Sequence, residues 1–218
     1  MSQIKEGRKR PMKLIIAEKP SLARNIVAGI GKMGKKDGYF INSDYIVSWA
    51  FGHLFSLVDV ETYTCVEGAG WTLDNLPCFP KEFKFELRKA DNKKGVDSGV
   101  KKQFGIITQL VNRSDVDTIV NAGDADREGE IIVRLCVENA LKEPKLQKRL
   151  WLPDQTPETV AKALTEMKDE SEYDNLAGEG FARTYIDWLY GVNLTRYATI
   201  KTGRLLRVGR VIAPIVRA

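Results

Sequence analysis

The sequence predicts an α/β fold, a Rossmann-like parallel sheet with helices on both faces, followed by the start of an all-helical domain. Short β-branched runs alternate with amphipathic helical patterns over residues 12–152, which is typical of a parallel sheet covered by helices. The alternation then stops, and the apolar spacing from Tyr173 to Ile200 is helical. We therefore expect a disordered basic tail at residues 1–11, an α/β domain at 12–152 and a truncated helical domain at 153–218.

The first strand and the first helix are predicted on either side of a short turn. Residues 13–17 form an apolar run of strand length, and apolar residues from Leu22 to Ile30 recur at helical spacing. Glu18 follows the strand at its carboxyl end, where ligands bind in open α/β sheets. Lys19 beside it can hold a phosphate as a point charge, although a solvated surface pair has the same sequence.

A β hairpin is predicted next. Its strands are residues 39–41 and 45–49, and residues 35–38 have the composition of a turn. His53 follows the second strand and is the only histidine in the chain. It is either a structural hydrogen bonder or the one histidine available to a mechanism.

The segment before the central strand is rich in aromatic residues and then in lysine and glycine. Trp71 is either a core residue or an aromatic face for a base. A mobile, solvated loop is predicted at residues 88–102. Apolar residues from Val100 to Val111 then recur at helical spacing and predict a helix.

The functional prediction depends on the stretch from Asp117 to Leu141. A buried strand around Ile119 is followed by the turn Gly123-Asp124-Ala125-Asp126-Arg127-Glu128-Gly129-Glu130 and by an amphipathic helix. Alternate residues of an extended turn can point the same way, so Asp124, Asp126 and Glu128 are expected to converge. A hard divalent cation such as Mg²⁺ relieves the repulsion between converging carboxylates. The alternative is that these residues only favour the start of a helix, where its macrodipole stabilises negative charge.

Two further elements complete the α/β part. Residues 148–151 predict another strand. A helix is predicted from Thr156, as N-cap with Pro157 at the first helical position, to about Met167.

The bulk composition excludes several protein classes. The chain has 218 residues, 43% of them hydrophobic, without a membrane-length apolar run or a signal-peptide pattern. Its three cysteines have no C-x-x-C spacing, which argues for a reducing compartment and against a zinc site. The net charge is +5, and the segment from Phe181 to Ala218 holds seven basic residues and one acidic residue. A basic segment combined with an acidic metal-type site indicates a polyanion as partner.

Several stretches together resemble type IA DNA topoisomerases, and topoisomerase III most closely. They are Ala17-Glu18-Lys19-Pro20-Ser21, Phe51-Gly52-His53-Leu54, Gly123 to Glu130, Asp187-Trp188-Leu189-Tyr190-Gly191-Val192-Asn193-Leu194-Thr195-Arg196 and Val208-Gly209-Arg210-Val211. The acidic turn alone is shared with other Toprim proteins, whereas the combination is specific. The resemblance implies a Toprim domain at 12–152, followed by the start of the helical domain that holds single-stranded DNA.

The resemblance also implies roles for individual residues. Mg²⁺ would be bound by Glu18, Asp124, Asp126 and Glu128, and Glu18 and Lys19 would be catalytic at the scissile phosphate. The implied DNA contacts are Trp71, Trp188, Arg196, Arg204, Arg207, Val208, Gly209, Arg210, Val211 and Ile212. Arg207 stands where the family often has serine and Ile212 where it often has glutamine, so the contacts there are expected to differ in detail.

The resemblance implies an isomerase that cleaves, passes and rejoins single DNA strands through a 5′-phosphotyrosine. The family's Ser-Tyr-Pro-Arg-Thr motif does not occur in this sequence. We therefore expect an N-terminal fragment that binds metal and single-stranded DNA, lacks the nucleophile and is inactive in cleavage alone. We expect it to be a monomer in the bacterial cytoplasm or nucleoid, without membrane contact. The alternatives are a Toprim metal-dependent nuclease or primase-like enzyme, and a non-catalytic nucleic-acid-binding module.

Overall fold

The computed structural model describes residues 11–64, 71–90 and 95–211. The chain divides into two compact units. Unit 1 consists of residues 1–55 and 87–177, and unit 2 consists of residues 56–86 and 178–218. Apart from Pro11, the predicted basic tail lies outside the described residues.

Unit 1 contains one sheet and the helices around it. Its strands are β1 (Met12–Ala17), β2 (Gly34–Lys36), β3 (Tyr39–Ile41), β4 (Tyr45–Trp49), β7 (Val116–Ala122), β8 (Leu146–Arg149) and β9 (Lys168–Asp169). Its helices are α1 (Pro20–Ile30), α3 (Ser98–Val111), α4 (Arg127–Ala140), α5 (Pro157–Ala163) and the 3₁₀ turn η2 (Glu170–Tyr173). The long helix α6 (Asp174–Thr202) begins in unit 1 and continues through unit 2.

The order of the strands decides which loops become neighbours. The seven-stranded sheet has the order β2-β3-β4-β1-β7-β8-β9. The inner strands β4, β1, β7 and β8 are parallel, whereas β2, β3 and β9 pair antiparallel at the edges. Ala17 at the end of β1 is in register with Ala122 at the end of β7. The residues that follow these two strands therefore lie side by side, and the predicted α/β class is confirmed.

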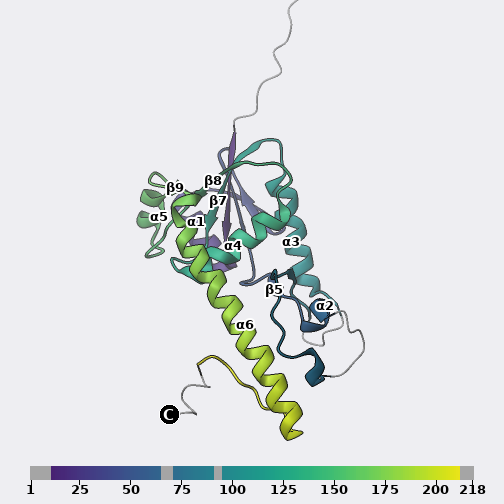
Figure 1. Ribbon diagram of the computed structural model, residues 1–218. Helices are drawn as coiled ribbons and strands as arrows, with labels where there is room; N and C mark the ends of the chain where they lie inside the picture. Colours follow the sequence, from purple (N-terminus) through teal and green to yellow (C-terminus); the bar gives the residue numbers. More distant parts are fainter. Residues whose placement is uncertain (1–10, 65–70, 91–94, 212–218) are drawn as a thin grey trace, which may run out of the picture. The chain divides into compact units, whose positions relative to one another are not determined.

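Helices cover both faces of the sheet (Figure 1). Ile15 and Val120 belong to a buried cluster with Leu22 and Ile26 of α1 and Val160 of α5. Since side chains alternate along a strand, residues such as Leu14 and Ile119 face the other way, where α3 and α4 pack against each other and against β7. The inner strands are thus buried on both faces, as parallel strands require.

Several predicted boundaries differ from the structure, and one is the strand predicted at residues 148–151, which is β8 at Leu146–Arg149. Residues 34–36 form β2 rather than part of a turn, because they pair with β3. The helix α3 begins inside the predicted loop, since the Asp97 side chain caps it by accepting from the amides of Gly99 and Val100. The helix α5 ends at Ala163 rather than near Met167, because the chain then turns to add Lys168–Asp169 to the sheet edge as β9.

Unit 2 contains α2 (Val60–Thr64), the 3₁₀ turn η1 (Leu73–Asn75) and most of α6. The strands β5 (Phe55–Leu57) and β6 (Phe85–Leu87) form a two-stranded sheet where the chain passes from one unit to the other. Phe83 stacks on Tyr185 of α6, with ring centroids 4.1 Å apart. No helix in the described part of the chain combines the length and the apolar character that a membrane crossing requires.

Candidate functional site

Three chain segments meet at the carboxyl edge of the inner strands. Glu18 follows β1, Asp124 follows β7 and His53 follows β4. The backbone amide of Asp124 donates a hydrogen bond to Oε2 of Glu18 at 3.2 Å, and the amide of Gly52 donates to the carbonyl of Glu18 at 3.0 Å. Parallel pairing of the three strands therefore brings together residues that are far apart in the sequence.

Lys19 and Asp124 form an ion pair within this site. Lys19 Nζ lies 2.5 Å from Oδ2 of Asp124, and both side chains are partly exposed. Partial burial and the nearby charge of Asp124 raise the pKa of Glu18. The hydrogen bond to Asp124 raises the pKa of Lys19. The site therefore holds closely spaced negative charge that a single lysine balances only in part.

One oxygen of Asp124 has no hydrogen-bond partner among the residues that the structure describes. Asp124 Oδ1 is buried and accepts no hydrogen bond from any described residue. A buried carboxylate oxygen without a donor is costly unless a cation or water satisfies it. Mg²⁺ prefers oxygen ligands and needs only one or two carboxylates, because it keeps several waters. The pair of Glu18 and Asp124 fits such an ion.

The other two acidic residues of the turn have partners of their own. Asp126 caps α4, and its Oδ1 accepts from the amide of Gly129 at 2.8 Å. Glu128 Oε2 lies 3.3 Å from Nε2 of His53. Within the described residues, no three histidine, cysteine or acidic side chains converge as a ready-made metal-binding group. The expected convergence of Asp124, Asp126 and Glu128 is therefore not seen, because helix capping and the histidine orient two of them.

Two glycines allow the turn to fold back on the helix. A Cβ atom on Gly123 would lie 2.0 Å from the carbonyl oxygen of Gly129, and one on Gly129 would lie 2.4 Å from the amide nitrogen of Asp124. Neither glycine has a positive φ, so close backbone contact, not conformation, requires them. Two glycines flanking the acidic turn indicate a tight bend or a close approach of a ligand, and the structure shows the tight bend.

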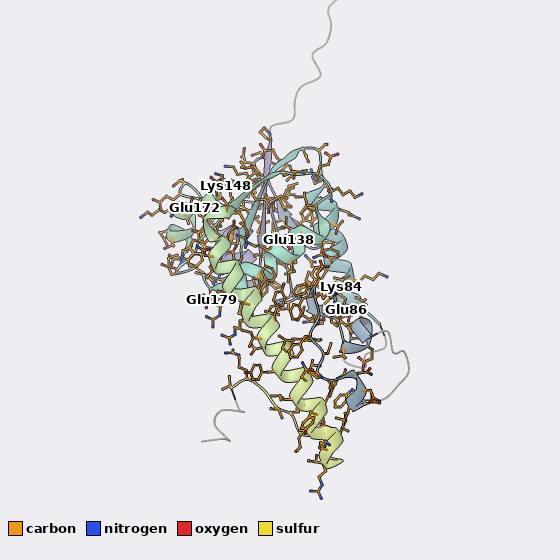
Figure 2. All side chains as sticks on the ribbon, in the orientation of Figure 1. Lys84, Glu86, Glu138, Lys148, Glu172 and Glu179 are labelled. Atoms are coloured by element: carbon orange, nitrogen blue, oxygen red, sulfur yellow. The ribbon has the colours of Figure 1, made fainter. Side chains whose placement is uncertain are left out.

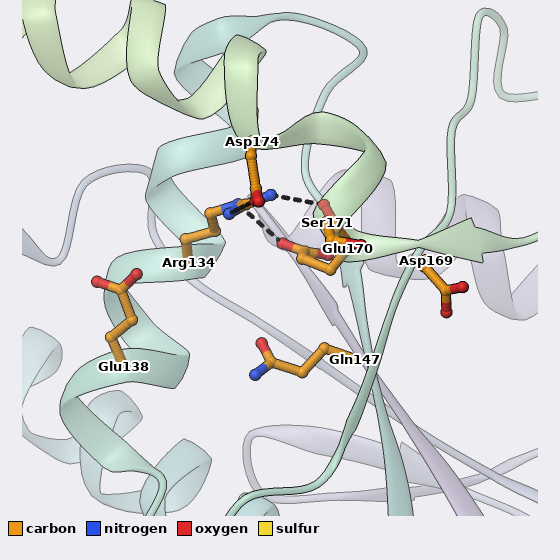
Figure 3. A pocket seen from close by; sticks show the side chains of 7 residues that line it. All are labelled: Arg134, Glu138, Gln147, Asp169, Glu170, Ser171 and Asp174. Carbon is orange, nitrogen blue, oxygen red and sulfur yellow. Dashed lines mark hydrogen bonds and ion pairs between the residues drawn. The ribbon is translucent and has the colours of Figure 1, made fainter.

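A network of buried charges lies behind the turn. Glu130 and Arg149 are fully buried, with Arg149 Nε donating to Glu130 Oε2 at 2.7 Å. Arg134 Nε donates to the other Glu130 oxygen at 2.6 Å and lies 3.1 Å from Glu170. On its outer side the network borders a polar pocket of about 340 Å³, where Arg134 points toward Glu170 and Asp174 (Figure 3).

Glu130, Arg134 and Arg149 were not predicted as functional residues from the sequence. The sequence does contain a signal for these residues. Glu130 lies within the apolar pattern of a helix, and Arg149 lies beside the apolar Leu150. Charged side chains at such positions are expected to be buried only when they form an ion pair. Lys148, the neighbour of Arg149, is labelled in Figure 2. It forms an exposed ion pair with Asp169. Alternation along β8 thus separates the buried cation from the exposed one.

Two predicted DNA contacts of unit 2 have partners within that unit. Arg196 forms two hydrogen bonds to the Glu61 carboxylate, at 2.8 and 3.1 Å. Its guanidinium lies 5.0 Å from the ring centroid of Trp71, which is 43% exposed. Trp188 packs edge-on against Tyr63 and Phe83. Arg196 therefore packs against the exposed ring of Trp71. Much of the Trp188 side chain packs against Tyr63 and Phe83.

Hydrogen bonds and an ion pair connect the segment after α6 to that helix. The amide of Val208 donates to Thr195 Oγ1 at 2.9 Å, and Arg210 Nε lies 2.5 Å from Oδ1 of Asp187. Arg204 and Arg207 are exposed and form no ion pair with another described residue. Val211 is 64% exposed, and Gly209 is half-buried. Ile212 lies outside the described residues.

The chain matches known proteins over most of its length. A family model for the Toprim domain matches residues 13–153. DNA topoisomerase 3 of Staphylococcus saprophyticus is 36% identical over 204 residues, which is 94% of this chain and 27% of that protein. The Bacillus cereus protein of the same name is 37% identical over 203 residues, which is 93% of this chain and 26% of that protein. The Bacillus subtilis protein is 36% identical over 201 residues, or 92% and 26%.

The chain spans about a quarter of the length of these relatives. Toprim domains are metal-binding, which agrees with the carboxylates that follow β1 and β7. The predicted resemblance to topoisomerase III is thereby confirmed. The strand order, the acidic turn and the family match agree, and the chain belongs to the Toprim family.

Proposed function

We propose that this chain supplies the Mg²⁺ site and part of the single-stranded DNA groove of a type IA DNA topoisomerase. The observation that carries the proposal is the contact of Glu18 with Asp124 at the carboxyl edge of the sheet, with Lys19 paired to Asp124. Cations at such a site stabilise the negative charge that develops on a phosphate during its transfer. We propose that the Toprim domain ends near residue 152, which the family match over residues 13–153 supports, whereas the compact unit 1 continues to residue 177.

The proposal assigns the metal to Glu18 and Asp124, assisted by Asp126 and Glu128. Bound Mg²⁺ would neutralise charge that builds on the non-bridging phosphate oxygens. Lys19, with its side chain 41% exposed, is placed to stabilise the same charge. We also assign to Glu18 the transfer of a proton to the departing 3′ oxygen and its return on resealing.

The proposal assigns the DNA contacts to unit 2. The exposed face of Trp71 would stack on a base without reading sequence. Arg204 and Arg207 would contact phosphates, together with the segment from Val208 to Ile212, and Trp188 would contribute only its free edge. We propose that the chain acts as a monomer in the bacterial cytoplasm or nucleoid.

The nucleophilic tyrosine of the 5′-phosphotyrosine step is assigned to another part of the full-length enzyme. The tyrosines of α6 lie in a helical pattern without the family's nucleophile motif. The chain alone is therefore expected to hold DNA and metal without cleaving.

One gel experiment tests the proposed function. End-labelled single-stranded DNA is incubated with the chain and Mg²⁺ and is run on native and denaturing gels, with Asp124→Asn as the matched variant. A native shift with intact, protein-free DNA on the denaturing gel is the expected result. Free cleavage products that disappear with a chelator would instead identify a Toprim nuclease, and no shift would remove the DNA-binding assignment.

A further inference from the structure

Arg149 is the one arginine in the described part of the chain whose side chain is fully buried. A buried guanidinium destabilises a protein unless its charge and its donors are all matched. Each nitrogen of the Arg149 guanidinium has at least one acceptor, and Glu130 matches its charge. Nε donates to Glu130 at 2.7 Å, Nη1 donates to the carbonyls of Asn121, Gly123 and Leu150 at 3.2, 3.0 and 2.8 Å, and Nη2 donates to the carbonyl of Asp124 at 2.8 Å.

These bonds concentrate on the turn that carries the candidate metal site. Asn121 lies near the end of β7, and Gly123 and Asp124 follow that strand. Arg149 reaches all three because β8 pairs with β7. Bonds to the carbonyls of Gly123 and Asp124 fix the peptide groups on both sides of the Asp124 Cα atom. They therefore fix the direction in which the Asp124 carboxylate leaves the backbone.

Arg149 acts on the turn through geometry rather than as a counter-charge for the site. Its charge is matched by Glu130, whose second oxygen accepts from Arg134. The Asn121 side chain adds to the same support, because its Oδ1 accepts from the amide of Gly123 at 3.0 Å. The planar fork of a guanidinium can bond several carbonyls at once, which a lysine ammonium cannot reproduce.

We propose that Arg149 is a positioning residue for the divalent cation, because it holds the peptide groups of Gly123 and Asp124 in the orientation that aims the Asp124 carboxylate at the ion. This inference rests on the proposed metal site. Removing a group that orients a metal ligand typically lowers metal affinity 10- to 100-fold.

The test measures Mn²⁺ binding to the whole chain by electron paramagnetic resonance of the free ion. The variants are Arg149→Lys, Asp124→Asn and Arg113→Lys, and all are measured at a temperature where circular dichroism shows them folded. Arg113 is the matched control, because it forms a two-bond pair with Asp115 in the same unit away from the site. We expect wild-type affinity for Arg113→Lys, at least tenfold weaker binding for Arg149→Lys and loss of binding for Asp124→Asn.

The outcomes separate the inference from the proposed function. Wild-type affinity in a folded Arg149→Lys variant, with binding lost in Asp124→Asn, would overturn the positioning role and leave the metal site intact. Absence of Mn²⁺ binding by the wild-type chain would overturn the metal site and the inference with it. If Arg149→Lys does not fold, the double variant Arg149→Met with Glu130→Gln removes both buried charges and the bonds to the carbonyls together, and unchanged Mn²⁺ affinity in that folded variant also overturns the inference.

Discussion

Lys19 and Asp124 are 105 positions apart in the sequence, and the Lys19 ammonium lies 2.5 Å from the Asp124 carboxylate. The ammonium therefore places a positive charge beside the carboxylate that a divalent cation would use through its other oxygen, Oδ1. Lys19→Met should raise the affinity for Mn²⁺ about two- to fivefold, because a partly exposed pair of this kind contributes at most about 1 kcal/mol. The same variant should bind single-stranded DNA more weakly, since it loses a cation. Weaker Mn²⁺ binding would show that Lys19 supports the ion rather than competing with it.

The contact between Gly123 and Gly129 predicts a large effect for one added methyl group. Gly129→Ala places a Cβ atom 2.5 Å or less from backbone atoms of Asp124, so the turn must shift. The free energy of unfolding in urea should fall by about 1–3 kcal/mol. Gly105→Ala in α3 is the control, because its Cβ meets nothing within 4 Å, and it should stabilise the chain by about 0.5–1 kcal/mol. Equal stabilities for the two variants would contradict the close backbone contact.

Glu170 predicts how stability changes with pH. Burial first, and then the charge of Glu130, raise its pKa to about 7, and its Oε2 accepts no hydrogen bond from a described residue. A carboxyl group whose folded pKa is raised stabilises the fold when protonated, so this contribution is present below pH 4.5 and is lost as the pH rises through 7. The free energy of unfolding should therefore fall by roughly 1–3 kcal/mol between about pH 5.5 and pH 8.5.

Glu170→Gln should flatten that dependence, since the amide keeps the hydrogen bonds of a neutral acid. Glu172→Gln removes an exposed carboxylate of the same 3₁₀ turn and should leave the dependence unchanged. Urea titrations at several pH values would measure both. A Glu170→Gln variant that retains the wild-type slope would assign the pH dependence to another group.

Arg204 and Arg207 predict a salt-dependent loss of DNA binding. Each is exposed and has no ion pair with another described residue, so its charge is available to a phosphate. Replacing both with alanine should weaken binding of single-stranded DNA and make the slope of log affinity against log salt shallower by about 1.4, or ~0.7 per phosphate contact. Fluorescence anisotropy at several salt concentrations measures the slope. An unchanged slope would place the DNA path elsewhere.

Most strands and helices of unit 1 could be predicted from the sequence, because apolar periodicity and capping residues indicate them, whereas the edge strands β2 and β9 could not. The hairpin of β3 and β4, the Thr156 cap of α5 and the burial of α4 all follow from local patterns. The order β4-β1-β7-β8 does not, because pairing between distant strands leaves no local signal.

The candidate site likewise shows what local sequence patterns cannot predict. Its residue types pointed to Asp124, but the orientation of Asp126 and Glu128 depends on the helix cap and on His53. The role of Arg149 required knowledge of which carbonyls lie opposite the end of β8. The sequence could identify the acidic residues, whereas only the fold identifies the residues that contact and orient them.

The strand order also has a consequence for how the protein is made. β1 leaves the ribosome well before its partner β7, which is synthesised only after the whole of residues 56–86. Until then β1 has β4 on one side and an open edge on the other, and open apolar edges recruit other chains. The nascent protein therefore passes through an aggregation-prone interval that closes only when Ala122 emerges, and a chaperone that binds extended apolar strands would act in that interval.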